Sequence, residues 1–129
     1  MSFLKNLFKS SATKSGIVFI VEDNPVYAKI LAESLKANFP QIKEVKKFPV
    51  GETCLEELHK NPDLIIIDHF LDSQYFDAET GLKIVGQIRK EKEKMNIIFL
   101  SSQQDVDIVK AAINKYHCSY VQKDHDSLL

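Results

Sequence analysis

Three stretches of the chain are continuously apolar, and each is short enough to form one strand. They are 17–21 (Ile-Val-Phe-Ile-Val), 64–67 (Leu-Ile-Ile-Ile) and 97–100 (Ile-Ile-Phe-Leu). Such runs, rich in β-branched side chains, are typical of strands buried on both faces, as in parallel sheets. A shorter and more exposed strand is predicted around Ile42, Val45 and Phe48, and the last strand at Ser119–Gln122.

Between these strands, apolar residues recur at the spacing of amphipathic helices. Asn24 followed by Pro25 is a strong helix start, with the asparagine as N-cap and the proline in the first turn. The helices are predicted at 25–39, 49–60, 81–93 and 105–116, with these inward-facing residues: Val26, Ile30, Leu31, Leu35 and Phe39; Val50, Cys54, Leu55 and Leu58; Leu82, Ile84, Val85 and Ile88; Val106, Val109, Ala112 and Ile113. Strands and helices alternate five times, which predicts an α/β fold with a doubly wound, five-stranded parallel sheet.

The two ends of the chain depart from this regular alternation. A fifth helix would begin near Asp126, and the sequence stops at Leu129, so this helix is expected to be truncated or absent. At the other end, 1–16 is an amphipathic segment and linker ahead of the domain at 17–129, and its apolar stripe is Phe3, Leu4, Leu7 and Phe8. The stripe is a candidate cover for the gap left by the fifth helix, in its own molecule or swapped into a homodimer. The alternatives are a frayed terminus or a native chain that continues past residue 129.

Composition limits the classes of function. The chain of 129 residues is 44% hydrophobic and 27% charged, with a net charge of −1, which is ordinary for one globular domain. That balance gives no reason to expect direct nucleic-acid binding, and no apolar run is long enough to span a membrane. Cys54 and Cys118 match no metal or redox spacing and are interpreted as buried thiols in a reducing, cytoplasmic setting.

Polar residues stand where the predicted strands end. Glu22 and Asp23 follow the first strand, Asp68 ends the third, Ser101 the fourth and Lys123 the fifth. The carboxyl ends of parallel strands meet at one edge of the sheet, where open α/β folds bind ligands. Clustered carboxylates repel one another, and a hard divalent cation such as Mg²⁺ relieves that conflict. Taken singly, each residue has a plainer interpretation as a helix cap, a turn residue or a surface charge; together they favour a phosphoryl-transfer site.

This pattern resembles the receiver domain of two-component response regulators over residues 17 to about 125. The positions that carry the resemblance are the acids Glu22-Asp23, the phosphoacceptor Asp68, Gly81-Leu82 at the start of the third helix, Ser101 with the small Ser102 after it, the aromatic Tyr120, and Lys123. The departures are a longer loop after Asp68 without the usual proline, and Asp124 in place of the proline that customarily follows the lysine. The resemblance implies a flavodoxin-like strand order, 2-1-3-4-5.

The resemblance also implies a function. A histidine kinase or phosphotransfer protein would transfer a phosphoryl group to Asp68 with Mg²⁺, and the module would catalyse only this transfer and its own dephosphorylation. Asp23, Asp68 and the main-chain carbonyl of Phe70 would ligate the metal, with Glu22 acting mainly through water. The expected roles of the remaining residues are phosphoryl binding by Ser101 and Lys123, switching by Ser101 and Tyr120, and tuning of the phosphoryl lifetime by Phe70 and Gln103.

Three other functions compete with this interpretation. A flavodoxin-type flavin carrier would need a first loop that binds phosphate with hydroxyls and amides. The acids Glu22-Asp23 in that loop would repel the phosphate. A haloacid-dehalogenase-type phosphatase would need its nucleophile after the first strand. A receiver-like interaction module that works without phosphorylation is the more serious alternative. The histidines suggest no site: His59, His117 and His125 are interpreted as surface residues, and His69 as a solvated loop residue.

Overall fold

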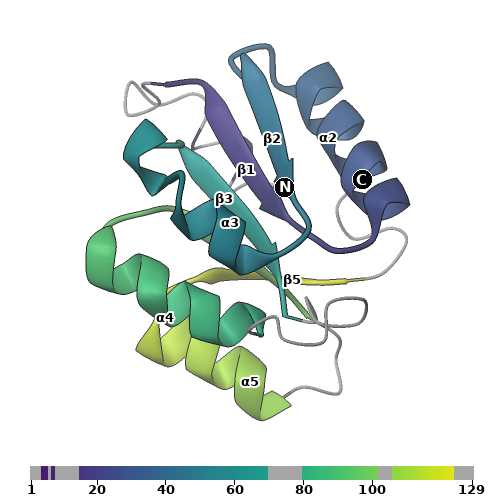
Figure 1. The fold of residues 1–129 in the computed structure, drawn as a ribbon. Coiled ribbons are helices and arrows are strands. Elements are labelled where there is room, and N and C mark those ends of the chain that lie inside the picture. Colours follow the sequence, from purple (N-terminus) through teal and green to yellow (C-terminus); the bar gives the residue numbers. More distant parts are fainter. Residues whose placement is uncertain (1–3, 6, 8–14, 70–79, 102–105, 124–129) are drawn as a thin grey trace.

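The computed structural model describes residues 4, 5, 7, 15–69, 80–101 and 106–123 (Figure 1). Five parallel strands form one sheet in the order β2-β1-β3-β4-β5. The strands are β1 (Ile17–Val21), β2 (Glu44–Phe48), β3 (Leu64–Asp68), β4 (Ile97–Ser101) and β5 (Ser119–Gln122). The predicted doubly wound parallel sheet and its order are therefore confirmed.

Helices connect successive strands and cover the sheet. They are α2 (Pro25–Asn38), α3 (Gly51–Leu55), the 3-10 turn η1 (Leu58–Lys60), α4 (Gly81–Glu91), α5 (Val106–Lys110) and the π-helical turn η2 (Ala111–Lys115). The predicted cap of α2 is confirmed, because the Asn24 side chain accepts hydrogen bonds from the amides of Val26 and Tyr27 at 3.0 and 3.1 Å. Within the described part of the chain, none of the helices has the length and apolar character needed to cross a bilayer.

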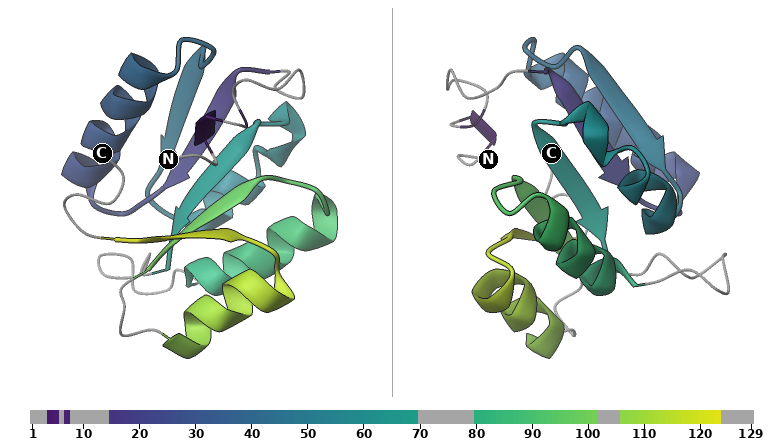
Figure 2. Two further views of the ribbon diagram at one scale, coloured as in Figure 1. Left: turned by 180° about the vertical axis from the view of Figure 1, so that it is seen from behind. Right: turned by 60° about the vertical axis from the view of Figure 1, so that its left-hand side comes forward.

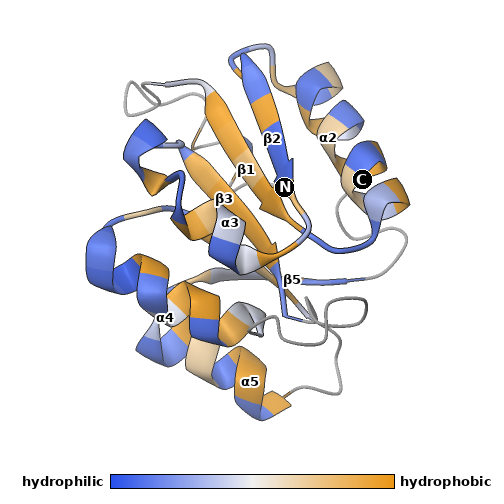
Figure 3. Cartoon of the chain, in the orientation of Figure 1, coloured by the Kyte–Doolittle hydropathy of each residue, from blue (hydrophilic) through white to orange (hydrophobic). Residues whose placement is uncertain are grey.

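Side chains of the central strands alternate between two cores, one on each face of the sheet. One core joins Phe19, Ile65, Ile67 and Phe99 to α3, α4 and η2, and contains the buried Cys54 and Cys118. Burial raises the pKa of these two thiols to about 12 and about 11, in keeping with inert core cysteines. The other core joins Val18, Ile20, Ile66, Ile98 and Leu100 to α2. Strand β1 is accordingly apolar along its length and β3 is apolar up to its last residue, Asp68, whereas β2 is mixed (Figure 3).

The predicted inward faces of two helices need correction. On α2, Val26 and Ile30 are 65% and 49% exposed, and the buried stripe is Ala28, Leu31, Ala32 and Leu35. Both sets have helical spacing, so periodicity alone could not separate the core face from the solvent face. In α5 and the η2 turn that continues it, Ala112 is buried as predicted, but Val106 and Ile113 are exposed. The π-turn at η2 explains the exposure of Ile113, because it lengthens the helical repeat on which the predicted stripe depended; Val106 precedes this turn.

Two helices are also shorter than predicted. The 49–60 segment divides into α3 and η1, and α4 ends at Glu91. Glu57 lies at the division and forms ion pairs with Lys46 of β2 and with Lys60, the latter at 2.7 Å. After η1, Asn61 adopts a left-handed conformation (φ 53°), which turns the chain toward β3.

The N-terminal segment contributes to the second core. Leu4 is only 3% exposed and belongs to the α2-side core, and Leu7 packs against the same core. Seen from behind, this short purple segment lies over the face of the sheet opposite α3 and α4 (Figure 2). The structure thus places two residues of the predicted stripe in the core of their own molecule. Phe3, Phe8 and the expected fifth helix near Asp126 lie outside the described residues.

We expect the Leu4→Ala substitution to destabilise the protein by about 2 to 4 kcal/mol, because it removes a buried aliphatic side chain and leaves a cavity. The free energy of unfolding from a urea titration measures this loss. Lys5→Ala, at an exposed neighbouring position, is the matched control and should change stability by less than about 0.5 kcal/mol. Equal stability of the two variants would contradict a core role for Leu4.

Candidate functional site

The strand order brings three carboxylates to one edge of the sheet. Glu22 and Asp23 follow β1, and Asp68 is the last residue of β3. Parallel pairing of β1 with β3 aligns Val21 with Ile67, so Glu22 and Asp68 leave neighbouring strands at the same level. The Glu22 amide donates to the Phe48 carbonyl at 2.9 Å, which extends the pairing with β2 up to the first acid. The convergence predicted from the sequence is therefore present.

These carboxylates are buried, and the ammonium group of Lys123 contacts two of them. Glu22, Asp23 and Asp68 are 3%, 6% and 1% exposed, and one potential ligand atom from each lies within 4.8 Å of the others. The Lys123 Nζ lies 2.6 Å from Glu22 Oε1 and 3.3 Å from Asp68 Oδ2. One ammonium thus pairs with two of the three clustered carboxyl groups, so the acids of the cluster outnumber the cation that pairs with them.

This excess appears in the pKa values of the cluster. Burial, reinforced by the nearby Glu22 charge, raises the pKa of Asp68 from 3.8 to about 7 despite Lys123. Burial also raises the pKa of Glu22, although Lys123 opposes the shift. For Lys123, burial alone would lower the pKa, but Glu22 and Asp68 more than offset it and raise the pKa. A further positive charge would therefore be favourable at this site.

The donor set fits a hard divalent cation. Mg²⁺ takes oxygen ligands at about 2.1 Å, so two opposite ligands are about 4.2 Å apart, close to the spacing of this cluster. Lys123 engages one oxygen of Glu22 as well as Asp68, and the Asn24 amide donates to the other Glu22 oxygen at 3.2 Å. The residues present thus suit Mg²⁺ better than a soft metal, which would require thiolates or imidazoles.

The raised pKa of Asp68 predicts how stability depends on pH and on the metal. Without metal, the folded protein retains the Asp68 proton up to about pH 7, whereas the unfolded chain releases it near pH 4. The stability from this proton is fully present below about pH 4 and is lost as the pH rises through 7. Mg²⁺ requires the deprotonated carboxylate, so its stabilising effect should be larger at about pH 7.5 than at about pH 5.5.

Melting temperatures measured with Mg²⁺ or EDTA at both pH values test this expectation. Asp68→Asn is the control, since it removes the titrating group. The effect of Mg²⁺ on its melting temperature should differ much less between the two pH values. If Mg²⁺ raised the melting temperature of the wild-type protein equally at both pH values, this result would contradict the assignment of Asp68 as a titrating metal ligand.

The fourth and fifth strands supply the other side of the site. Ser101, at the end of β4, is 1% exposed, and its carbonyl accepts hydrogen bonds from the Tyr120 hydroxyl at 3.0 Å and from the Lys123 amide at 2.9 Å. Tyr120 is half-buried and packs against the α3–α4 core. Two further predicted site residues, Phe70 and Gln103, lie outside the described residues.

Sequence reasoning missed two side chains near the site. Tyr27, in the first turn of α2, places its ring 4.9 Å from Lys123 Nζ, a cation–π contact. Its position in the helical turn directly after the acids could have indicated this. His69 was predicted to be solvated, but it is 7% exposed, with its ring centroid 5.7 Å from that of Phe99. That prediction was wrong because the strand alternation continues one residue past Asp68 and directs His69 into the core.

The other acid of the 63–68 stretch has a structural role at the opposite edge of the sheet. The Asp63 carboxylate accepts hydrogen bonds from the Gly16 amide at 2.8 Å and from the Ser15 amide and hydroxyl at 3.2 Å each. It thereby fastens the entry of β1 to the start of β3. Asp63 and Asp68 bound the same strand, and only Asp68 lies in the carboxylate cluster.

Comparisons with known proteins agree with this geometry. The family model described as the response regulator receiver domain matches residues 18–128. Similar solved structures include the receiver domain of NtrX from Brucella abortus (16% identity, TM-score 0.71, 84% of this chain and 87% of that one) and TrrA from Thermotoga maritima in complex with Mg²⁺-BeF (26%, 0.66, 85% and 88%). The phosphorylated cyanobacterial phytochrome response regulator RcpA is also similar (23%, 0.70, 85% and 81%).

The NtrX and RcpA likenesses establish the fold alone. No curated protein matches the sequence. The family match spans most of the chain, and receiver domains are signalling modules of two-component systems rather than classical enzymes. The chain therefore belongs to the response regulator receiver domain family.

Proposed function

We propose that this domain accepts a phosphoryl group on Asp68 from the phosphohistidine of a histidine kinase or a phosphotransfer protein. The observation that carries the proposal is the placement of a buried carboxylate between two other acids and a lysine, at the carboxyl edge of the sheet. In the family to which the chain belongs, this edge is the phosphoryl-accepting edge. The proposed partners follow from that family membership.

In the proposed transfer, an Asp68 oxygen attacks phosphorus and forms the O–P bond as the donor's P–N bond breaks. The bonding electrons and a proton stay with the departing imidazole. Lys123, already 3.3 Å from Asp68, would pair with a phosphoryl oxygen and limit the charge that accumulates in the cluster. Burial around Asp68 would exclude most water from the attacking oxygen.

Asp23, Asp68 and the main-chain carbonyl of Phe70 would hold Mg²⁺, with Glu22 acting mainly through water. The cation would supply neutralisation of the phosphoryl oxygens. The support for this set within the described residues is the cluster of the three acids.

Phosphorylation would switch the interaction surface through Ser101 and Tyr120. We infer that the Ser101 hydroxyl moves to a phosphoryl oxygen. The hydrogen bond from Tyr120 to the Ser101 carbonyl couples the aromatic ring to that residue. A local charge event would thus bias a two-state element, as in other phosphorylation switches. A Tyr120 side chain with the same NMR signals before and after phosphorylation would refute this role.

The proposed lifetime of the aspartyl phosphate is long. Phe70 and Gln103 take the two positions that tune attack by water in the family; an apolar Phe70 cannot orient a water molecule, although Gln103 could. We expect slow autodephosphorylation, accelerated by Phe70→Asn. Decay of the phosphorylated species in the two proteins measures this effect, and an unchanged or slower rate in the variant would contradict it.

Incubation of the wild-type protein with a small phosphodonor, with Mg²⁺ or with EDTA, tests the proposed function. The expected result is one added phosphoryl group per chain in the intact mass, only with Mg²⁺. Absence of labelling with any donor, including a purified histidine kinase, would instead favour an interaction module that works without phosphorylation.

A further inference from the structure

The aromatic ring of Tyr27 lies against the lysine of the carboxylate cluster. Lys123 Nζ lies over the face of this ring, 4.9 Å from its centroid. The same ammonium is 2.6 Å from Glu22 Oε1 and 3.3 Å from Asp68 Oδ2. Lys123 is therefore held by groups from three parts of the fold: the residue after β1, the last residue of β3 and the first turn of α2.

The start of α2 fixes the position of the tyrosine. The Tyr27 amide donates to the Asn24 side chain at 3.1 Å, and Pro25 restricts the backbone of the first turn. The Tyr27 side chain is half-buried and packs against the α2-side core. Because Asn24 directly follows the acids in sequence, the turn that begins the helix also brings the ring to Lys123.

The contact with the ring differs in kind from the two ion pairs of Lys123. A cation over an aromatic face is attracted by the ring quadrupole, so the contact adds no formal negative charge to the cluster. Glu22 and Asp68, the ion-pair partners, are also potential metal ligands, and Lys123 would share their oxygens with a metal ion bound there. An aromatic face is not a ligand for a hard cation. The ring can therefore keep its contact with the ammonium while the acids are engaged elsewhere.

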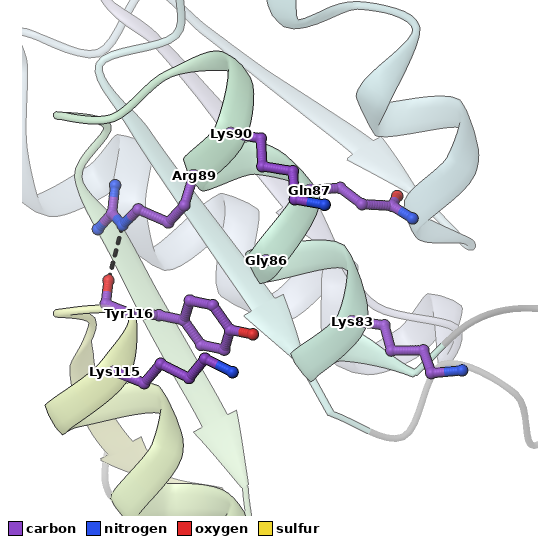
Figure 4. A pocket seen from close by; sticks show the side chains of 7 residues that line it. All are labelled: Lys83, Gly86, Gln87, Arg89, Lys90, Lys115 and Tyr116. Atoms are coloured by element: carbon purple, nitrogen blue, oxygen red, sulfur yellow. Dashed lines mark hydrogen bonds between the residues drawn. The ribbon is translucent and has the colours of Figure 1, made fainter.

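A second lysine–tyrosine pair shows what distinguishes this contact. Lys115 lies over the ring of Tyr116, with Nζ 5.3 Å from the centroid, in the open groove between α4 and η2 (Figure 4). Lys115 is exposed, whereas the side chain of Lys123 is 28% exposed and contacts buried acids. Cation–π attraction is weak at exposed sites and stronger where the cation is desolvated. The contact at Lys123 should therefore fix its ammonium more firmly than the surface pair does.

We propose that Tyr27 is a positioning residue, whose ring holds the Lys123 ammonium beside Asp68 when the acids are engaged by a metal ion or a phosphoryl group. This role rests on the proposed function, in which Lys123 pairs with a phosphoryl oxygen. Tyr27 acts through the lysine and forms or breaks no bond in the transfer. The role requires an aromatic ring at position 27 and does not require its hydroxyl group.

The NMR signal of the Lys123 side chain tests the contact without any labelling. Protons held over an aromatic face are shielded, so the Lys123 Hε signal of the wild-type protein should lie upfield of the ordinary lysine range, with EDTA and with Mg²⁺. Lys123→Arg, in which this signal is absent, assigns it. Tyr27→Phe should keep the shielding and Tyr27→Leu should remove it, while the Lys115 signal should stay unchanged in both variants.

The rate of labelling tests the role in the transfer. With Mg²⁺ and a small phosphodonor, Tyr27→Leu should be labelled at least about threefold more slowly than the wild type, and Tyr27→Phe should recover most of that loss. Phe39→Leu is the matched control, because it also replaces an aromatic residue that packs against the α2-side core, about 18 Å farther along the helix axis. This control should be labelled like the wild type.

Four results would each overturn the proposal: an unshielded Lys123 signal in the wild type, unchanged labelling of Tyr27→Leu, a Tyr27→Phe protein as slow as Tyr27→Leu, or equal slowing by Phe39→Leu. Failure of the proposed function would give a different result. The wild type would then not be labelled with any donor, while a shielded Lys123 signal that is lost in Tyr27→Leu would still support the positioning of the ammonium by the ring.

Discussion

The Asp68→Asn protein is expected to show no labelling by a small phosphodonor in the presence of Mg²⁺. The substitution keeps the shape of the side chain but removes the nucleophilic carboxylate and one metal ligand. The variant should nevertheless fold. Burial and the Glu22 charge raise the pKa of Asp68, so a neutral amide relieves repulsion at neutral pH, and the metal-free variant should melt at a higher temperature than the wild type.

Asp63→Asn is the matched control for this experiment. It changes the acid at the other end of the same strand, where the carboxylate holds Ser15 and Gly16. This control should lose stability yet be labelled like the wild type, the reverse of the Asp68 variant. Undiminished labelling of Asp68→Asn would rule out Asp68 as the acceptor, whereas equal loss in both variants would indicate a general folding defect.

Gly81→Ala is expected to reduce both stability and phosphorylation. A Cβ at residue 81 would lie 2.2 Å from the Asp68 carbonyl oxygen and 2.7 Å from the His69 Cα, both backbone atoms. No rotamer change can relieve this overlap, so the start of α4 or the end of β3 must move, at a cost of about 1 to 3 kcal/mol or more. Because Asp68 ends β3, its carboxylate should be displaced and labelling should slow.

Gly86→Ala, in the middle of α4, is the control for the Gly81 variant. The three atoms nearest to its Cβ all belong to the Tyr116 side chain, at 3.2 Å or more, and alanine raises helix propensity. Its stability should be unchanged or slightly higher, and its labelling should be normal. Denaturant titration and the initial rate of labelling measure both effects; a Gly81 variant as stable and as readily labelled as wild type would refute the steric argument.

Much of this fold could be predicted because the strongest patterns lie in its centre. The runs in β1, β3 and β4 are buried on both faces, so their sequences are continuously apolar, without the polar positions that a solvent-exposed face introduces. Parallel pairing then brings their carboxyl ends to one edge, and this is why Glu22, Asp23, Asp68 and Lys123 could be grouped without coordinates. Gly81 could be identified by resemblance, whereas its steric reason needed the distance to the Asp68 backbone.

The predictions failed where a choice depended on three-dimensional neighbours. Val26 and Ile30 have the same spacing as the true core stripe of α2, and only the position of the sheet decides which stripe is buried. The π-turn at η2 adds a residue to the helical repeat without a sequence signal, so Ile113 was placed on the wrong face. His69 and Tyr27 were missed because their neighbours come from other elements.

The burial of Leu4 has a practical consequence for the limits of the domain. The family match begins at residue 18, so a fragment trimmed to the match would lack a side chain that packs in the same core as Ile66 and Ile98. Such a fragment would expose part of the sheet face, and its self-association in solution would be an artefact of the cut. Expression tags and fusion partners are therefore better placed beyond an intact N-terminal segment than attached directly to β1.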